Sequence, residues 1–322
     1  MKAAVYERYG PPEDVLSIRD VPVPVPSEGQ VLIRVVAAAL NSWDWDQLYG
    51  TPQGKLGAGK RIRNPILGAD VAGVVEAAGP GVTRFKAGDA VFGELSQTGW
   101  GGLAEHAVAA EKYLALKPES MSFEDAAAMP QAGMLALQGL RRRPIEPGDR
   151  VLINGGGGGV GTFAIQMATL AGAEVTGVDR AMKAEAMTAA GADHVIDYER
   201  EDFAKNGQRY DVILDMVASR PMTDYVRCLN RGGALAIIGG KTPVLLSAVT
   251  WGSLLSLVSG QRLRLVIYWP KAEDLEELAR LYLAGAVRPV IGCVLPLARV
   301  GEAFRLIGDG LAIGKLVIRV AA

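Results

Sequence analysis

The segment VLINGGGGGVGTFAIQMA (151–168) holds the residue types best suited to chemistry, because small residues separate two apolar runs. Gly156, Gly158 and Gly161 match the spacing G-x-G-x-x-G between a predicted strand and a predicted helix. We expect Gly156 to allow a tight turn, Gly158 to let the backbone approach a pyrophosphate, and Gly161 to let the helix pack closely on the strand. Amides at the start of the helix would then face phosphate oxygens. The pattern predicts dinucleotide binding, and a flexible glycine loop is the alternative.

The end of the next predicted strand indicates which dinucleotide would bind. Asp179 stands near the place where an acidic residue holds the ribose hydroxyls of NAD. Arg180 and Lys183 follow it and could hold a 2′-phosphate instead. Asp179 would repel such a phosphate unless it turned away and paired with Arg180. Because two cations flank the site, we expect NADPH rather than NADH; the alternative is that both cations merely start a solvated helix.

Composition excludes several classes of protein. The 322 residues favour two domains, and 34 basic against 35 acidic residues give a net charge of −1, which argues against nucleic acid as a partner. Cys228 and Cys293 cannot build a disulfide framework, so we expect the reduced cytoplasm. His106 and His194 leave little for a metal site.

Two long stretches without charge, 151–173 and 242–261, raise the question of a membrane. The first opens with glycines, and the second contains Pro243 and several hydroxyl side chains that hydrocarbon disfavours. Glu7 and Arg8 stand where a signal peptide has its apolar run. We expect both stretches to be buried segments of a soluble protein, with no membrane partner.

The elements that position the glycine loop follow from the apolar pattern. Short runs punctuated by Pro and Gly predict an all-β region, a small barrel, over the first 118 residues. From 149 onward strands alternate with helices, which predicts an α/β fold with a doubly wound parallel sheet. The predicted strands there are RVLIN (150–154), EVTGVD (174–179), HVIDY (194–198), YDVILDMV (210–217) and GALAIIGG (233–240). The tail, 295–320, returns to a helix and a strand that we expect to join the barrel.

Several long motifs in order resemble the zinc-free quinone oxidoreductase group of the medium-chain dehydrogenase/reductase superfamily. They include ALNSWDWDQLYG (39–50), PILGADVAGVVEAAGPGV (65–82), VLINGGGGGVG (151–161), GADHVIDY (191–198) and GKLVIRV (314–320). The resemblance implies a GroES-like barrel from residues 1–121 and 287–322 and an inserted Rossmann domain from 122–286. It also implies NADPH, hydride transfer to a quinone or to the activated C=C of an enone, and a homodimer.

The resemblance assigns roles to individual residues. Asn41 would lie beside the nicotinamide, and Lys315 matches the lysine of the terminal Gly–Lys motif. Tyr198 would lie near the adenosine phosphate. The remaining cofactor contacts that it implies are Gly158, Gly159 and Val160 under the pyrophosphate, and Met216, Val217, Gly239 and Gly240 at the ends of later strands. Zinc-binding relatives carry cysteine and a His–Glu pair where this chain has 41–44 and 68–70, so no zinc is expected.

Without zinc, hydrogen-bond donors must meet the oxyanion that develops when an enone takes up hydride. Candidates are the amide of Asn41, the hydroxyl of Tyr49 and that of Tyr268, with Asp44 orienting a donor or a water. Asp44 could instead cap a turn, and Tyr49 could be barrel packing. Two other functions stay open: a pathway-specific enoyl reductase or alcohol dehydrogenase, and a catalytically quiet NADPH-binding sensor or structural protein.

Overall fold

The computed structural model describes residues 1–55, 62 and 64–320, which form two compact units. The first unit comprises Met1–Met134, Pro270–Gly285 and Ile291–Ala322, and the second comprises Leu135–Trp269 and Ala286–Val290. The second unit is therefore inserted into the first along the chain. The boundaries differ from the expected ones, because 122–134 and 270–285 cluster with the first unit. The hydroxyl of Tyr282 donates to Asp125 at 2.7 Å, which ties these two segments to each other.

The first unit is built on a largely antiparallel sheet with strand order β14-β15-β3-β4-β5-β7, and β6 pairs with β3 as well. The final strand pairs with β3 as expected, because its alternate apolar residues face the same buried core. The elements of the unit are β1 (Lys2–Tyr6), α1 (Pro12–Val15), β2 (Leu16–Asp20), β3 (Gln30–Leu40), α2 (Ser42–Tyr49), β4 (Asp70–Ala78), β5 (Ala90–Glu94), β6 (His106–Ala110), β7 (Leu114–Leu116), α3 (Phe123–Ala128), α9 (Ala272–Leu283), β14 (Ile291–Pro296), α10 (Val300–Gly308) and β15 (Lys315–Arg319).

Helix α2 corrects the expectation of an all-β region. A single carboxylate anchors its start: Asp44 accepts the backbone N–H of Asn41 at 2.8 Å and that of Gly68 at 2.8 Å. Gly50, with φ of +65°, ends the helix in the left-handed conformation that glycine adopts readily. The helix thus depends on a contact with a distant loop, which apolar periodicity does not reveal.

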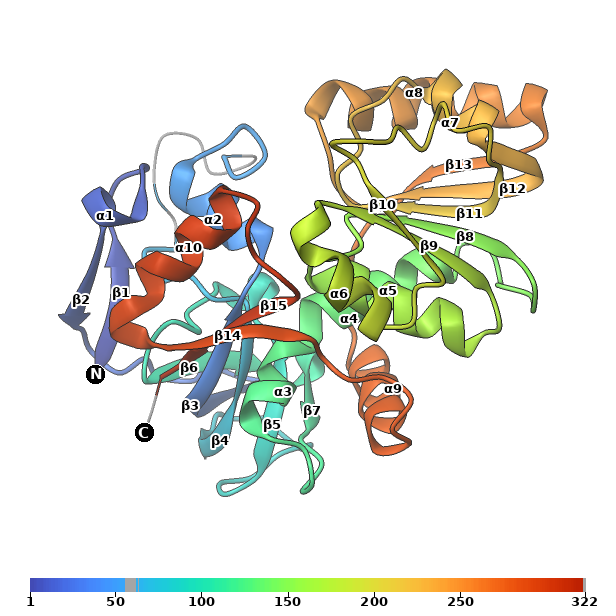
Figure 1. Cartoon of the computed structure of the whole chain (residues 1–322). Coiled ribbons are helices and arrows are strands. Elements are labelled where there is room, and N and C mark those ends of the chain that lie inside the picture. Colours follow the sequence, from blue (N-terminus) through green and yellow to red (C-terminus); the bar gives the residue numbers. More distant parts are fainter. Residues whose placement is uncertain (56–61, 63, 321–322) are drawn as a thin grey trace. The chain divides into compact units, whose positions relative to one another are not determined.

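The second unit is a parallel sheet with strand order β10-β9-β8-β11-β12-β13 (Figure 1). Helices α5 and α6 lie on one side of this sheet, and α7 and α8 lie on the other (Figure 1). Its elements are β8 (Arg150–Asn154), α5 (Gly159–Leu170), β9 (Glu174–Asp179), α6 (Ala184–Ala189), β10 (His194–Asp197), β11 (Tyr210–Asp215), α7 (Met222–Cys228), β12 (Leu229–Ile237), α8 (Thr242–Ser259) and β13 (Arg262–Leu265); α4 (Pro130–Leu140) begins in the first unit and ends in this one. The predicted α/β fold is confirmed.

Helix α8 corrects the expectation that the second uncharged stretch is buried. Leu257 and Val258 are 82% and 83% exposed, and Trp251 is 61% exposed. The helix is apolar on every side, so only one face can pack on the sheet while the others stay in contact with solvent. Within the described ranges, no helix combines the length and apolar character needed to cross a bilayer.

Candidate functional site

The glycine loop joins β8 to α5 in the second unit. Its tight turn lies at Gly155, with φ of +89°, one residue before the position that we expected. Gly161 must lack a side chain, since a Cβ there would stand 2.2 Å from the backbone oxygen of Gly155. A Cβ on Gly156 would meet the sulfur of Met187 at 2.8 Å. These two glycines serve close packing of the loop, as G-x-G-x-x-G requires.

Gly158 has a different environment. A Cβ added there would meet only one atom, the Gly155 oxygen at 3.5 Å, so open space faces this residue. Gly159, Val160 and Gly161 follow in the first turn of α5, where backbone N–H groups have no acceptor within the helix. An open cradle lined by such N–H groups suits a phosphate. The residues present therefore fit the pyrophosphate of a dinucleotide.

The residues after β9 are paired differently from our expectation. Asp179 is buried; it accepts the backbone N–H of Gly157 at 3.1 Å and lies 3.3 Å from the ammonium of Lys183. Its carboxylate is thus engaged with Lys183, and it also accepts the backbone N–H of Arg180 at 2.9 Å. Arg180 instead donates from Nε to the hydroxyl of Tyr198 at 2.9 Å. Lys183 is engaged in this buried ion pair, whereas Arg180 and Tyr198 are the exposed members of this set of side chains after β9.

Two later strand ends reach the glycine loop. A Cβ on Gly155 would lie 3.3 Å from Met216 and 3.8 Å from Val217, so both predicted residues border the turn. Gly239 accepts from the backbone of Ala218 at 2.9 Å, and a Cβ on Gly240 would stand 2.2 Å from the oxygen of Ala218. The carboxyl ends of β8, β11 and β12 therefore meet, as expected for a ligand site on a parallel sheet.

Asp215, a residue that the sequence patterns did not indicate, holds these strand ends together. Asp215 is buried and accepts from the Asn154 amide at 3.0 Å, the backbone of Val217 at 2.9 Å and the Tyr225 hydroxyl at 2.8 Å. Burial raises the pKa of Asp215, and these donors oppose that rise. An aspartate at the end of an apolar strand was the available signal.

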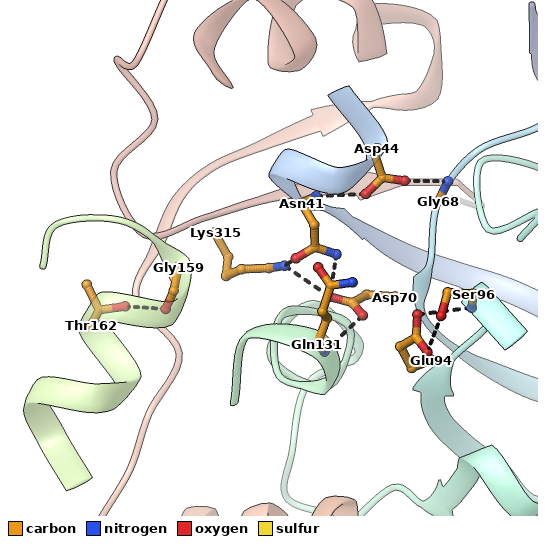
Figure 2. A network of polar contacts seen from close by, with 10 residues as sticks. All are labelled: Asn41, Asp44, Gly68, Asp70, Glu94, Ser96, Gln131, Gly159, Thr162 and Lys315. Carbon is orange, nitrogen blue, oxygen red and sulfur yellow. Dashed lines mark hydrogen bonds and ion pairs between the residues drawn. The ribbon is translucent and has the colours of Figure 1, made fainter. Parts of the chain in front are cut away.

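Figure 2 shows a buried polar network in the first unit, centred on Asp70. One oxygen of Asp70 accepts from the Asn41 amide at 3.0 Å and from the Lys315 ammonium at 3.0 Å. The other oxygen accepts the backbone N–H of Gln131 at 3.0 Å. Lys315 also donates to the amide oxygen of Asn41 at 2.5 Å. Asp70 is 0% and Lys315 2% exposed, so the two charges neutralise each other away from water.

Two further carboxyls are buried close to this network (Figure 2). Burial raises the pKa of Asp44 to about 7, although its backbone donors and Lys315 act against the rise. Burial raises the pKa of Glu94 to about 8, and the charge of Asp70 adds to the rise. Glu94 accepts from the backbone N–H and hydroxyl of Ser96 at 3.0 and 2.9 Å. The neighbourhood therefore holds more acids than bases.

Of the predicted catalytic residues, the structure joins Asn41 to Lys315 but gives Asp44 and Tyr49 other surroundings. Asp44 is fully buried, and both its oxygens hold backbone N–H groups, which is a capping role. The Tyr49 ring stacks on Trp45 with centroids 4.4 Å apart. Burial and then the charge of Glu13 raise the pKa of the Tyr49 hydroxyl, so it stays protonated. In the described part of the chain, no group of three or more His, Cys, Asp or Glu could hold a metal ion.

Comparison with known proteins agrees with this arrangement. The models for the alcohol dehydrogenase GroES-like domain and for the zinc-binding dehydrogenase match residues 27–119 and 190–318. A chloroplast envelope quinone oxidoreductase homolog of Arabidopsis thaliana is 34% identical over 99% of this chain and 98% of its own length. An NADPH-dependent alkenal/one oxidoreductase of the same plant is 34% identical over 99% and 79%.

Solved structures are similar over the same extent. The quinone oxidoreductase from Coxiella burnetii is 30% identical, with a TM-score of 0.89 over 100% of this chain and 99% of that one. The Escherichia coli quinone oxidoreductase complexed with NADPH is 25% identical, with a TM-score of 0.85 over 99% and 100%.

Proposed function

The chain belongs to the quinone oxidoreductase-like group of the medium-chain dehydrogenase/reductase superfamily, and we propose that it is an NADPH-dependent, zinc-independent enzyme that transfers hydride to a quinone or to the activated C=C of an enone. The observation that carries the proposal is the open cradle at Gly158, set among the converging strand ends. Bound NADPH would supply the hydride. The protein would bind and orient the cofactor and the substrate, and it would stabilise the charge that develops on the substrate.

The pairing of Asp179 supports NADPH over NADH. Its oxygens accept the backbone N–H groups of Gly157 and Arg180 and pair with the ammonium of Lys183, so the carboxylate is not directed to ribose hydroxyls. The Arg180 guanidinium donates to the Tyr198 hydroxyl and lies 3.4 Å from the exposed carboxylate of Glu199, and a 2′-phosphate could replace that carboxylate as its partner. The preference for NADPH would therefore reside in Arg180.

Replacing Arg180 with alanine tests this preference by fluorescence titration with each cofactor. We expect about tenfold or greater loss of NADPH affinity with NADH affinity unchanged, because a charge-assisted hydrogen bond is lost. Arg227→Ala, which removes an exposed arginine paired with Asp224, is the matched control and should change neither. Equal losses for NADPH and NADH would contradict the assignment.

The network around Asp70 supports a role in orienting ligands. Asn41 donates one amide hydrogen to Asp70, and its second amide hydrogen has no partner within the residues described here. The Lys315 ammonium donates to two acceptors, Asn41 and Asp70, and these two bonds fix its orientation. Two positioned donors beside one another can stabilise negative charge on a carbonyl oxygen. The proton that completes enone reduction can come from solvent, so no side chain is required for it.

A turnover panel tests the reaction itself. NADPH oxidation should be stimulated by electron-poor quinones and by enones, and chelation of zinc should leave the rate unchanged. Tight NADPH binding without oxidation on any acceptor would instead support the catalytically quiet alternative. Loss of activity with a zinc chelator, restored by zinc, would contradict zinc independence.

We also propose that the enzyme is a homodimer whose second copy covers the apolar face of α8. Trp251, Leu257 and Val258 on α8 and Ile267 after β13 are 61–83% exposed, and among the described residues β13 is the last strand of its sheet. Light scattering should give the mass of two chains. Leu257→Glu combined with Val258→Glu should reduce it to one, whereas Leu170→Glu, at a separate exposed leucine, should not; a wild-type mass of one chain would refute the proposal.

The unpaired thiols of Cys228 and Cys293 support the reduced cytoplasm as the compartment of this enzyme. Fractionation of the source cells should recover it with cytoplasmic markers. Recovery with another compartment would refute this placement.

A further inference from the structure

Gln131 carries a donor that the folded chain does not use. It is the second residue of α4, its side chain is 4% exposed, and its Nε2 has no hydrogen-bond acceptor among residues 1–55, 62 and 64–320. Buried amide hydrogens are nearly always bonded. A methionine of similar shape would avoid the cost of leaving this N–H unpaired. The amide is therefore a feature that folding alone does not explain.

The position of this amide is fixed by the polar network. The backbone N–H of Gln131 donates to Asp70, whose other oxygen is taken by Asn41 and Lys315. Figure 2 shows the Gln131 side chain directed toward Asn41. The acceptors nearby are thus already occupied by other donors, while the Gln131 amide is held beside them.

The charges around Gln131 select the kind of ligand. Lys315 is neutralised by Asp70 at 3.0 Å, and Asp44 and Glu94 are acids buried nearby. Such surroundings disfavour a phosphate or carboxylate ligand, which would bring further negative charge. A neutral amide N–H suits a neutral carbonyl oxygen, which can accept it without carrying a full charge.

We propose that Gln131 is a binding residue whose Nε2 donates to a carbonyl oxygen of a ligand held beside Asn41 and Lys315. The oxygen belongs either to the carboxamide of NADPH or to the carbonyl of the substrate. The identity of these ligands rests on the proposed function. The shared chemistry, a neutral carbonyl acceptor, does not depend on which of the two supplies it.

Gln131→Met tests the proposal, because it removes the donor and keeps the approximate volume. NADPH affinity is measured by fluorescence titration, and 2-cyclohexenone affinity by calorimetry on protein saturated with NADP⁺. We expect one of the two affinities to fall about five- to tenfold, the cost of one hydrogen bond. A loss for NADPH assigns the oxygen to the cofactor, and a loss for 2-cyclohexenone assigns it to the substrate. Gln131→Leu, which also lacks the donor, should show the same loss.

Thermal unfolding of the free protein separates binding from a structural role. Gln131→Met should keep the wild-type Tm or raise it by about 2 °C, since a buried unpaired donor is removed. Gln261→Met is the matched control: this buried glutamine donates from Nε2 to the oxygens of Val226 and Leu229, both at 3.0 Å, so its loss should lower Tm.

The proposal is overturned if neither affinity changes more than twofold, or if Gln131→Met lowers Tm as the control does. Failure of the proposed function would show in the wild type. A wild-type protein that binds no NADPH refutes that function itself, and one that binds NADPH but not 2-cyclohexenone refutes only the substrate class. In the second case the NADPH titration alone decides the role of Gln131.

Discussion

The buried ion pair between Lys315 and Asp70 makes a quantitative prediction about stability. Lys315→Met removes the ammonium and leaves the Asp70 carboxylate, which is 0% exposed, without its counter-charge. Breaking a buried pair from one side costs about 3–5 kcal/mol. That loss is a large share of the roughly 5–15 kcal/mol by which a protein of this kind is stable. Urea unfolding followed by the fluorescence of the five tryptophans measures it.

A second substitution tests the stated cause. Adding Asp70→Asn to Lys315→Met removes the buried charge but keeps an oxygen for the backbone N–H of Gln131, so we expect about 2 kcal/mol or more to return. Lys2→Met is the control, because the exposed Lys2 ammonium lies 3.9 Å from the Asp20 carboxylate; it should lower the free energy of unfolding by less than about 0.5 kcal/mol. A loss under about 1 kcal/mol for Lys315→Met, or a double variant no more stable than the single one, would show that an uncompensated buried charge is not the cause.

Four further single substitutions have expected outcomes. Burial raises the pKa of Glu94 from 4.5 to about 8, so the unfolded chain loses this proton at lower pH than the folded protein, and stability falls as pH rises between these two values. Glu94→Gln should therefore flatten the fall in Tm between about pH 5 and 8. An unchanged slope of Tm against pH would contradict this expectation. Gly161→Ala should lower Tm, because its added Cβ would stand 2.2 Å from a backbone oxygen. Gly158→Ala should fold normally but bind NADPH at least about tenfold more weakly in titration. Wild-type affinity for NADPH in Gly158→Ala would show that the pyrophosphate lies elsewhere. Asp44→Asn leaves one of two backbone N–H groups without an acceptor, so it should lower the free energy of unfolding in urea by about 1–3 kcal/mol. Its kcat/KM should stay within about threefold of the wild-type value. A much larger loss of kcat/KM at wild-type stability would indicate that Asp44 is a catalytic residue.

The sheet of the second unit could be predicted because its strands are continuous apolar runs. The run at 150–154 is strand β8 residue for residue, and the run at 174–179 is β9. Burial on both faces leaves such strands with one possible environment. The glycine spacing likewise predicted the loop, since Gly161 is required by its 2.2 Å approach to a backbone oxygen.

Features set by distant contacts could not be predicted. Helix α2 depends on Asp44 reaching the backbone of Gly68, and the pairing of Asp179 with Lys183 depends on the loop packed above them. The exposure of α8 could not be predicted either, because a helix that is apolar on all sides does not indicate which side is covered. Gln131 had one available signal, a lone amide within an apolar helix start, and only its missing acceptor reveals a use.

The most direct test of the proposed function follows the hydride itself. Purified protein is supplied with NADPH that carries deuterium at the transferable position and with 2-cyclohexenone, and the product is analysed by mass spectrometry and NMR. We expect oxidised cofactor and saturated ketone in equal amounts, with deuterium on the β-carbon of the ketone. A ketone without deuterium, or enone left intact while NADPH stays bound and unoxidised on every quinone and enone offered, would contradict it.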